Sequence, residues 1–231
     1  RQQLSKELRN ILRNIARHGT PLGAVCTGSV ALADAGLLSA YRSTIHWENM
    51  ESFKEEYPKL DITATLFEID RDRFTCSGGT APLDMMIHCV KLDHGDVLAR
   101  NVAEQLLHNT VRTPETGQRM DIEHRTGITH PKLLAAIGIM EAFIENPLQL
   151  ERIAGKVGLS LRQLERLFKE HLSVTPGKYY LALRLKLARQ LLRQTSMPIL
   201  EISIATGFSS AAHFASRYKA QYGHAPTGER T

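Results

Sequence analysis

Long hydrophobic runs are missing from this chain of 231 residues, although 42% of its residues are hydrophobic. No run reaches the roughly 18 consecutive apolar residues of a membrane-spanning helix, so the sequence predicts none. Cysteine is scarce as well, because Cys26, Cys76 and Cys89 are the only three and lack metal-ligand spacing. An odd number of such thiols argues against a disulfide framework and against a metal site. We therefore expect a cytoplasmic protein without a metal or other cofactor.

An initiating methionine is also missing, because the chain opens at Arg1 with the helical phrase RQQLSKELRNILRNIA. No secretion signal, which would join a basic start to a short apolar run and a small-residue cleavage site, is visible. We expect the chain to be the C-terminal part of a longer protein.

Aspartate is absent from residues 131–231, and this region holds 14 basic against seven acidic residues, a net charge of +7. Residues 1–130 hold 15 basic against 17 acidic residues, a net charge of −2. A basic excess confined to one region is typical of a domain that binds a polyanion. The charge alone is equally compatible with an ordinary solvated surface.

The first half of the chain alternates between strand and helix patterns. The sequence predicts a helix over 1–17, a strand over Leu22–Val25 and a helix ending at Gly36. Further on it predicts strands over 62–70 and 74–76 and helices over 81–92 and 96–107. Strands that alternate with helices indicate an α/β layer. We assign residues 1–108 to this domain.

Residues 109–131 are polar and rich in turn formers, and we interpret them as a linker. Beyond them, in a second domain over 132–231, only helical patterns occur. Six helices are predicted, over 132–145, 149–157, 160–171, 177–194, 198–206 and 209–222.

A helix-turn-helix pattern occurs twice in this second domain. The first copy has Ile153, Gly158 and Ser160 before a second helix, and the other has Ile202, Gly207 and Ser209. The copies lie 49 residues apart up to the serine and 50 apart beyond it. Each copy combines a short apolar helix, a glycine turn and a serine that we expect to cap the next helix. Two such units predict binding to two successive major grooves of double-stranded DNA.

The second helix of each copy carries the candidate DNA-contacting side chains. Arginine pairs with guanine, glutamine with adenine and glutamate with cytosine, while small apolar groups contact the thymine methyl. The first set comprises Ser160, Arg162, Gln163, Glu165, Arg166 and Lys169. The second set is smaller and suited to methyl and phosphate contacts: Ser209, Ser210, Ala212, His213, Ser216, Arg217 and Lys219. The alternative is a pair of ordinary helical hairpins with surface arginines.

Residues 132–229 resemble the DNA-binding domain of the AraC/XylS family of bacterial transcription activators. The resemblance includes Arg184-Leu185-x-x-Ala188-x-x-Leu191-Leu192 in the long helix and Gly207-Phe208-Ser209 in the second copy. It implies a sequence-specific regulator that binds promoter DNA and RNA polymerase.

The strand–Cys26-Thr27-Gly28–helix phrase in the first domain has the pattern of a nucleophile elbow, with a thiol at a helix N-terminus. His46, next to Trp47, is a candidate base for Cys26. Three interpretations stay open: a catalytic nucleophile, a ligand-pocket residue, or a buried structural thiol. Trp47 is suited to stacking on a ligand cation or to simple core packing.

This stretch resembles class I glutamine-amidotransferase-like domains of the PfpI type, as found in GlxA-type regulators. The resemblance rests on Cys26-x-Gly28, Thr44-x-His46-Trp47 and Ser77-Gly78-Gly79. It implies the latter half of a flavodoxin-like parallel sheet, a small-molecule effector contacted by Cys26, Thr27, His46 and Trp47, and a homodimer.

The expected function is a non-enzymatic, metabolite-responsive activator of amine or amino-acid catabolism genes. The alternative is a cysteine-dependent hydrolase or amidotransferase with a DNA-binding appendage.

Overall fold

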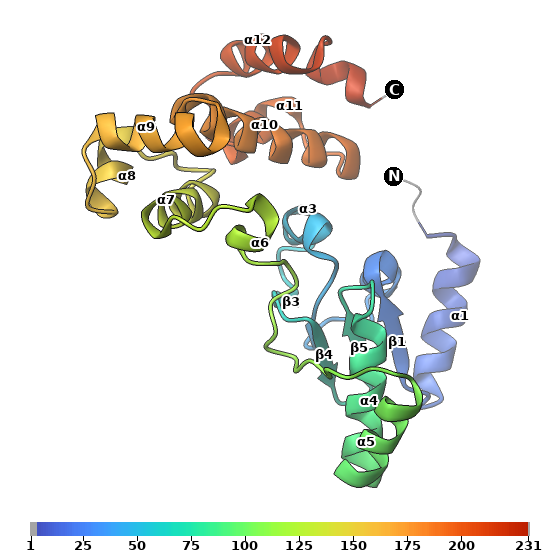
Figure 1. Ribbon diagram of the computed structural model, residues 1–231. Coiled ribbons are helices and arrows are strands. Elements are labelled where there is room, and N and C mark those ends of the chain that lie inside the picture. Colours follow the sequence, from blue (N-terminus) through green and yellow to red (C-terminus); the bar gives the residue numbers. More distant parts are fainter. Residues whose placement is uncertain (1–3, 231) are drawn as a thin grey trace. The chain divides into compact units, whose positions relative to one another are not determined.

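The computed structural model describes residues 4–230 (Figure 1), and the chain divides into two compact units, Arg1–Arg119 and Met120–Thr231. The expected linker over 109–131 is shared between them. Its first part packs in unit 1, because Arg112 and Gln118 donate hydrogen bonds to Asp84 and to the Thr44–Thr65 region. Its last part forms helix α6 (Ile122–Thr126) in unit 2. Within the described range, no helix has the length and apolarity needed to cross a membrane.

Unit 1 contains a three-stranded sheet in the order β1-β5-β4. Strand β1 (Leu22–Val25) pairs parallel with β5 (Arg73–Cys76), and β4 (Phe67–Asp70) pairs antiparallel with β5. Two short strands, β2 (Arg42–Ser43) and β3 (Asp61–Ile62), form a separate parallel pair. The predicted mixture of strands and helices is therefore present. However, the main sheet is mixed and not the parallel flavodoxin-like layer that the resemblance implied.

The predicted strand over 62–70 is wrong as a single element. Strand β3 ends at Ile62 and β4 begins at Phe67. Between them, the hydroxyls of Thr63 and Thr65 each donate to the buried Glu68 carboxylate at 2.8 Å. Residues 63–66 are therefore held in an irregular conformation, and the alternating apolar pattern does not extend as one strand.

The described residues of unit 1 also form five α-helices: α1 (Lys6–Arg17), α2 (Ser29–Asp34), α3 (Met50–Glu56), α4 (Ala81–His94) and α5 (Asp96–Gln105). Helix α1 begins after Ser5, whose side chain accepts from the Leu8 amide at 3.2 Å, so it is shorter than predicted. The first three residues of the predicted helix lie outside the described residues. The main core of the unit lies among β1, α2 and α3, around Leu22, Leu32, Leu38, Ile45 and Phe53.

Unit 2 is helical throughout its described residues. Its helices are α7 (Pro131–Ala142), α8 (Leu150–Lys156), α9 (Leu161–Leu172), α10 (Pro176–Gln194), α11 (Ile199–Ala205) and α12 (Ala211–Tyr222), after the short α6 and before a 3-10 turn at Pro226–Glu229. Each lies within a few residues of its predicted range.

Two apolar cores in unit 2 correspond to the two copies of the repeat. The first surrounds Ile153, Leu164 and Phe168, and the second surrounds Ile202, Phe214 and Tyr218, all fully buried. Helix α10 contributes to both cores, with Tyr180 in the first and apolar residues including Leu185 and Leu192 in the second. The long helix therefore joins the two helix-turn-helix units.

Candidate nucleic-acid interface

The first helix-turn-helix unit consists of α8, a turn at Gly158 and α9. Gly158 has φ of +65°, a conformation that glycine adopts with little strain. Ser160 then caps α9, since its Oγ accepts from the Gln163 amide at 3.3 Å and the Gln163 Oε1 accepts from the Ser160 amide at 2.8 Å. This reciprocal capping box fixes where α9 begins. It also occupies Gln163, which the sequence assigned to adenine contact.

Helix α9 has one buried and one exposed face. Leu164 and Phe168 are fully buried, and Leu167 is 7% exposed. The opposite face presents exposed side chains at Arg162, Gln163, Glu165, Arg166 and Lys169. The candidate DNA-contacting side chains of α9 are thus all on its exposed face. This face carries the hydrogen-bonding groups that a major-groove helix needs.

A hollow of about 410 Å³ borders this face of α9. It is lined by Gln163 and Arg166 together with His130 and Lys132 from the start of α7. Lys132 Nζ donates to the Gly158 carbonyl at 2.9 Å, which ties α7 to the turn. Sequence reasoning missed His130 and Lys132 because they lie outside the repeated motif.

The second unit consists of α11, a turn at Gly207 and α12. Ser210 caps α12 by accepting from the His213 amide at 3.2 Å, so the predicted cap at Ser209 is wrong. The reason is visible in the spacing: beyond the turn the copies lie 50 residues apart, which aligns Ser210 with Ser160. Ser209 instead belongs to the exposed turn before the cap.

The outer face of α12 presents Ser210, Ala212, His213, Ser216, Arg217 and Lys219, all exposed. Two of these side chains are coupled, because Arg217 Nε donates to His213 Nε2 at 3.2 Å. The His213 ring also lies 5.7 Å from the Phe208 ring, edge to face. Arg217 is therefore held by a neighbour one turn away, and it differs in this from the arginines of α9.

The second turn is held by Arg184 from α10. Its guanidinium donates to the carbonyl oxygens of Thr206 at 2.8 Å and Gly207 at 2.6 Å, and lies 4.1 Å above the Phe208 ring. Burial lowers the pKa of Arg184 from its usual value. Arg184, one of the residues that carry the family resemblance, therefore has a structural role, because it holds the turn of the second helix-turn-helix unit.

Gly207 lies against the first unit. A Cβ at this position would lie 2.5 Å from the Ile144 carbonyl oxygen and 2.5 Å from Pro147 Cγ, in the loop between α7 and α8. Its φ is +73°. The two helix-turn-helix units are therefore joined by this close contact as well as by α10. Their orientation relative to each other is restrained at these two places.

The end of the chain is held against α10 by the Glu229 carboxylate, which is 3% exposed. Arg189 Nε donates to it at 2.7 Å and Arg193 Nε at 2.6 Å. Desolvation alone would raise the pKa of Glu229, but these hydrogen bonds outweigh it and the pKa is lowered. No local sequence pattern indicates this contact, because Arg189 and Arg193 lie 40 and 36 residues before Glu229 in the chain.

In unit 1, Cys26 has the backbone of an elbow. It follows β1, has φ of +58° and begins a 3-10 turn that leads into α2. A Cβ on Gly78 would lie 2.8 Å from the Cys26 Cβ, so glycine is needed where these two segments of the chain approach each other. Positive φ at a residue other than glycine is strained and is found at functional turns.

The predicted partners of Cys26 are placed differently. His46 Nδ1 accepts from the Glu48 amide at 3.3 Å, and no hydrogen bond joins it to Cys26 in the described part of the chain. Trp47, considered for a ligand cation, is covered by the chain's own Arg119 guanidinium at 4.5 Å. Thr27 is exposed beside Cys26. The nearby Cys76 is buried, and its desolvation raises the pKa of the thiol.

Two serine-capped helix-turn-helix units, with exposed polar faces and a shared helix, define a DNA-binding domain of the double helix-turn-helix class. A family model described as a helix-turn-helix domain matches residues 153–231. The regulator ArgR of Pseudomonas aeruginosa is 45% identical over 219 residues, which are 95% of this chain and 67% of ArgR. The regulator GbdR of the same species is 44% identical over 229 residues, 99% of this chain.

The chain belongs to the AraC family of HTH-type transcriptional regulators. It spans 62% of the length of GbdR, less than two thirds. Among solved structures, an AraC-type transcriptional regulator from Chromobacterium violaceum is 55% identical, with a TM-score of 0.42, over 43% of this chain and 89% of that chain.

Proposed function

We propose that this chain binds double-stranded promoter DNA through α9 and α12 and regulates transcription in response to a small metabolite. The observation that carries the proposal is the pair of capped helices, each with a buried apolar face and an exposed polar face, fixed to one helix. The net charge of +7 over residues 131–231 supports a polyanionic partner.

Helix α10 supports contact with two successive major grooves. It has 19 residues, so at 1.5 Å per residue it is roughly 28 Å long. Major-groove faces on one side of B-DNA recur about every 34 Å. Together with the contact between Gly207 and Pro147, this length supports a proposed arrangement with α9 and α12 on one side of the duplex, one turn apart.

The two helices have different roles in this proposal. On α9, Arg162 and Arg166 contact guanine, and Glu165 accepts from cytosine. Gln163 contacts adenine only if its capping bond to Ser160 opens. On α12, Ala212 and the serines suit thymine methyl and phosphate contacts, while Arg217 and Lys219 anchor the backbone. Specificity then comes mainly from α9.

Selection of binding sites from random duplex DNA tests this function with the 231-residue chain. We expect enriched sequences with two short elements one helical turn apart, the better-defined one protected by α9. Arg162→Ala combined with Arg166→Ala should lose the α9 element and keep the other. Enrichment of no sequence, together with binding that disappears with moderate salt, would reduce the domain to a nonspecific DNA binder.

For unit 1 we propose a sensing domain of the amidotransferase-like type, in which Cys26, Thr27, His46 and Trp47 contact an amine or amino-acid effector. A homodimer and contact with RNA polymerase complete this proposal. The strained elbow at Cys26 supports it, while the Trp47 face is already covered by Arg119. Cys26→Ser should alter the effector response and leave effector-free DNA affinity unchanged.

The second candidate is a cysteine hydrolase or amidotransferase. The elbow geometry of Cys26 favours it, but His46 is hydrogen-bonded to the Glu48 amide and not to the thiol. Turnover of an amide by the wild type, lost in Cys26→Ser, would establish the enzyme in place of the sensor.

A further inference from the structure

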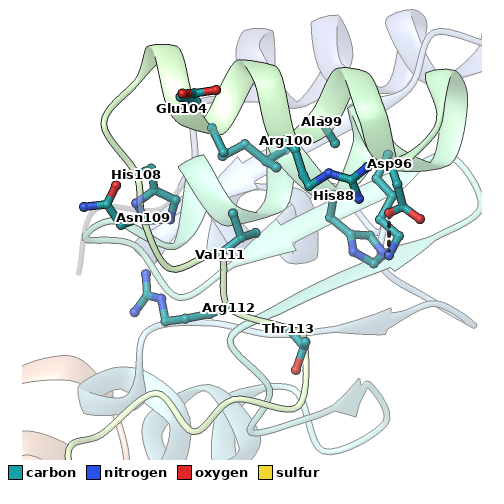
Figure 2. Close-up of a pocket in the computed structure, with 13 residues that line it drawn as sticks. His88, Asp96, Ala99, Arg100, Glu104, His108, Asn109, Val111, Arg112 and Thr113 are labelled. Atoms are coloured by element: carbon teal, nitrogen blue, oxygen red, sulfur yellow. Dashed lines mark ion pairs between the residues drawn. The ribbon is translucent and has the colours of Figure 1, made fainter.

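Unit 1 contains a pocket of about 450 Å³ that is separate from the Cys26 elbow. It lies between α4, α5 and residues 108–113, the segment that follows α5 (Figure 2). None of the four proposed effector residues at the elbow lines it. Its volume falls within the range of small-molecule sites in proteins.

The floor of the pocket is apolar. Ile87 from α4 packs with Ala99 and Ala103 from α5 in one buried cluster. Because Ala99 and Ala103 present only methyl groups, they leave space beside α5. Val111 forms the facing wall and is 41% exposed. Burial of this apolar surface against the apolar part of a ligand would stabilise the complex.

One end of the pocket is held by a network of hydrogen bonds around the buried Asp84 carboxylate. The Asp84 carboxylate, with no exposed surface, accepts from His108 Nε2 at 2.7 Å and from Arg112 Nε at 2.9 Å. Arg112 also donates to Thr80 Oγ1 at 2.6 Å. The bonds fix the segment over 108–112 against α4, so the wall is preorganised. Asp84 also offsets the charge of Arg112, so Arg112 is not available to pair with a ligand.

The other end carries a cation without a matching contact. Lys91 is paired with Asp96 at 2.9 Å, whereas Arg100 makes no ion-pair contact in the described residues and interacts with Asp96 only at longer range. Figure 2 shows Arg100 near His88 at the end of the pocket away from His108 and Arg112, with Val111 between. Glu104, also on α5, lies at the opposite end from Arg100.

We propose that this pocket binds a small organic carboxylate. Its carboxylate group pairs with Arg100, and its apolar body covers Ile87, Ala99 and Ala103. A guanidinium suits this role because it donates two parallel hydrogen bonds to a carboxylate. The site goes beyond the proposed DNA binding and does not depend on it, since every residue named lies in unit 1.

The experiment titrates the 231-residue chain with butanoate, hexanoate and benzoate, and with their primary amides, by calorimetry and ligand-observed NMR. We expect saturable binding of at least one acid, about tenfold tighter than its amide, because the amide lacks the charge. Arg100→Gln should weaken the acid about tenfold and leave the amide unchanged. Lys59→Gln, which removes an exposed cation elsewhere in unit 1, should change neither.

Val111→Trp tests the same site from the opposite wall, because an indole at this exposed position fills the pocket and should abolish binding. Circular dichroism confirms that each variant is folded. Equal binding of acid and amide, no saturable binding of any acid, or the same loss in Lys59→Gln as in Arg100→Gln would each overturn the proposal.

Discussion

Arg184 on α10 donates a hydrogen bond to the carbonyl oxygen of Gly207 at 2.6 Å. The helix that joins the two helix-turn-helix units therefore also holds the turn of the second unit. Gly207 also packs against Ile144 and Pro147 of the first helix-turn-helix unit. One small region therefore joins the second turn, the long helix α10 and the first helix-turn-helix unit. We therefore expect the spacing of α9 and α12 to depend on this region.

Replacing Arg184 should destabilise unit 2 without removing any of the side chains proposed to contact DNA. Arg184→Ala leaves the Thr206 and Gly207 carbonyls without their charged donor, and we expect a loss of about 2 kcal/mol in the free energy of unfolding. Arg184→Lys should recover only part of this, since one ammonium cannot reproduce the guanidinium fork. Urea denaturation measures the effect. Lys186→Ala, at an exposed position of the same helix, should cost little; an equal loss there would contradict the assigned role of Arg184.

Gly207→Ala should be more damaging than the same change at another glycine with positive φ. Gly223 has φ of +83° and nothing near its virtual Cβ, so Gly223→Ala should cost about 1 kcal/mol from backbone strain alone. Gly207→Ala adds a clash with Ile144 and Pro147 and should cost about 2–4 kcal/mol. Thermal unfolding of both variants separates strain from clash. Equal costs would show that the two helix-turn-helix units are not held in contact at Gly207.

Arg166 and Lys169 share the exposed face of α9, but we expect them to act differently. Arg166→Ala should cost about 1–3 kcal/mol on the specific site and relax the preference at one base pair. Lys169→Ala should weaken specific and random DNA alike and reduce the salt dependence of binding. Fluorescence anisotropy over a salt series measures both. Equal losses on both DNAs for Arg166→Ala would assign Arg166 to the phosphate backbone.

The helices of unit 2 were predictable because their signals are local. Glycine turns, serine caps and apolar spacing of three and four residues all lie within one helix or its ends. The one wrong cap shows the limit: Ser209 and Ser210 are adjacent, and only the count beyond the turn favours Ser210. Gln163 shows another limit, because a side chain suited to base contact is equally suited to a capping box.

In unit 1 the decisive contacts join distant residues, and the sequence could not indicate them. Strand β4 pairs antiparallel with β5 while β1 pairs parallel with it, a choice that depends on the tertiary packing. Gln118 Nε2 donates to the Thr65 carbonyl across 53 residues, which draws part of the expected linker into the unit. The contacts of Asp84 to His108 and Arg112 likewise join residues 24 and 28 positions apart in the chain.

Acid should weaken unit 2 through Glu229. Its folded pKa lies below its usual value, so its ion pairs contribute fully above the unfolded pKa of about 4.3 and are lost as pH falls through the folded pKa. Glu229→Gln should cost about 1–2 kcal/mol near pH 7 and progressively less below about pH 4, until it matches the wild type. Hydrogen exchange in α10 and α12 follows unit 2 separately from Asp84 in unit 1. A constant difference at all pH values would contradict the lowered pKa.

The geometry of α10 predicts how DNA binding depends on spacing. If α9 and α12 are fixed on one face of the protein, their two DNA elements must lie on one face of the duplex. Inserting about 5 bp between the elements turns the second by roughly half a helical turn, so specific binding should be nearly abolished. Inserting about 10 bp restores the face but lengthens the separation by roughly 34 Å, which a rigid α10 cannot span, so affinity should stay low. Footprinting and anisotropy on the three spacings measure this. Binding that survives the shorter insertion would mean that the two units reorient independently, and that neither α10 nor the contact of Gly207 with Pro147 restrains them on DNA.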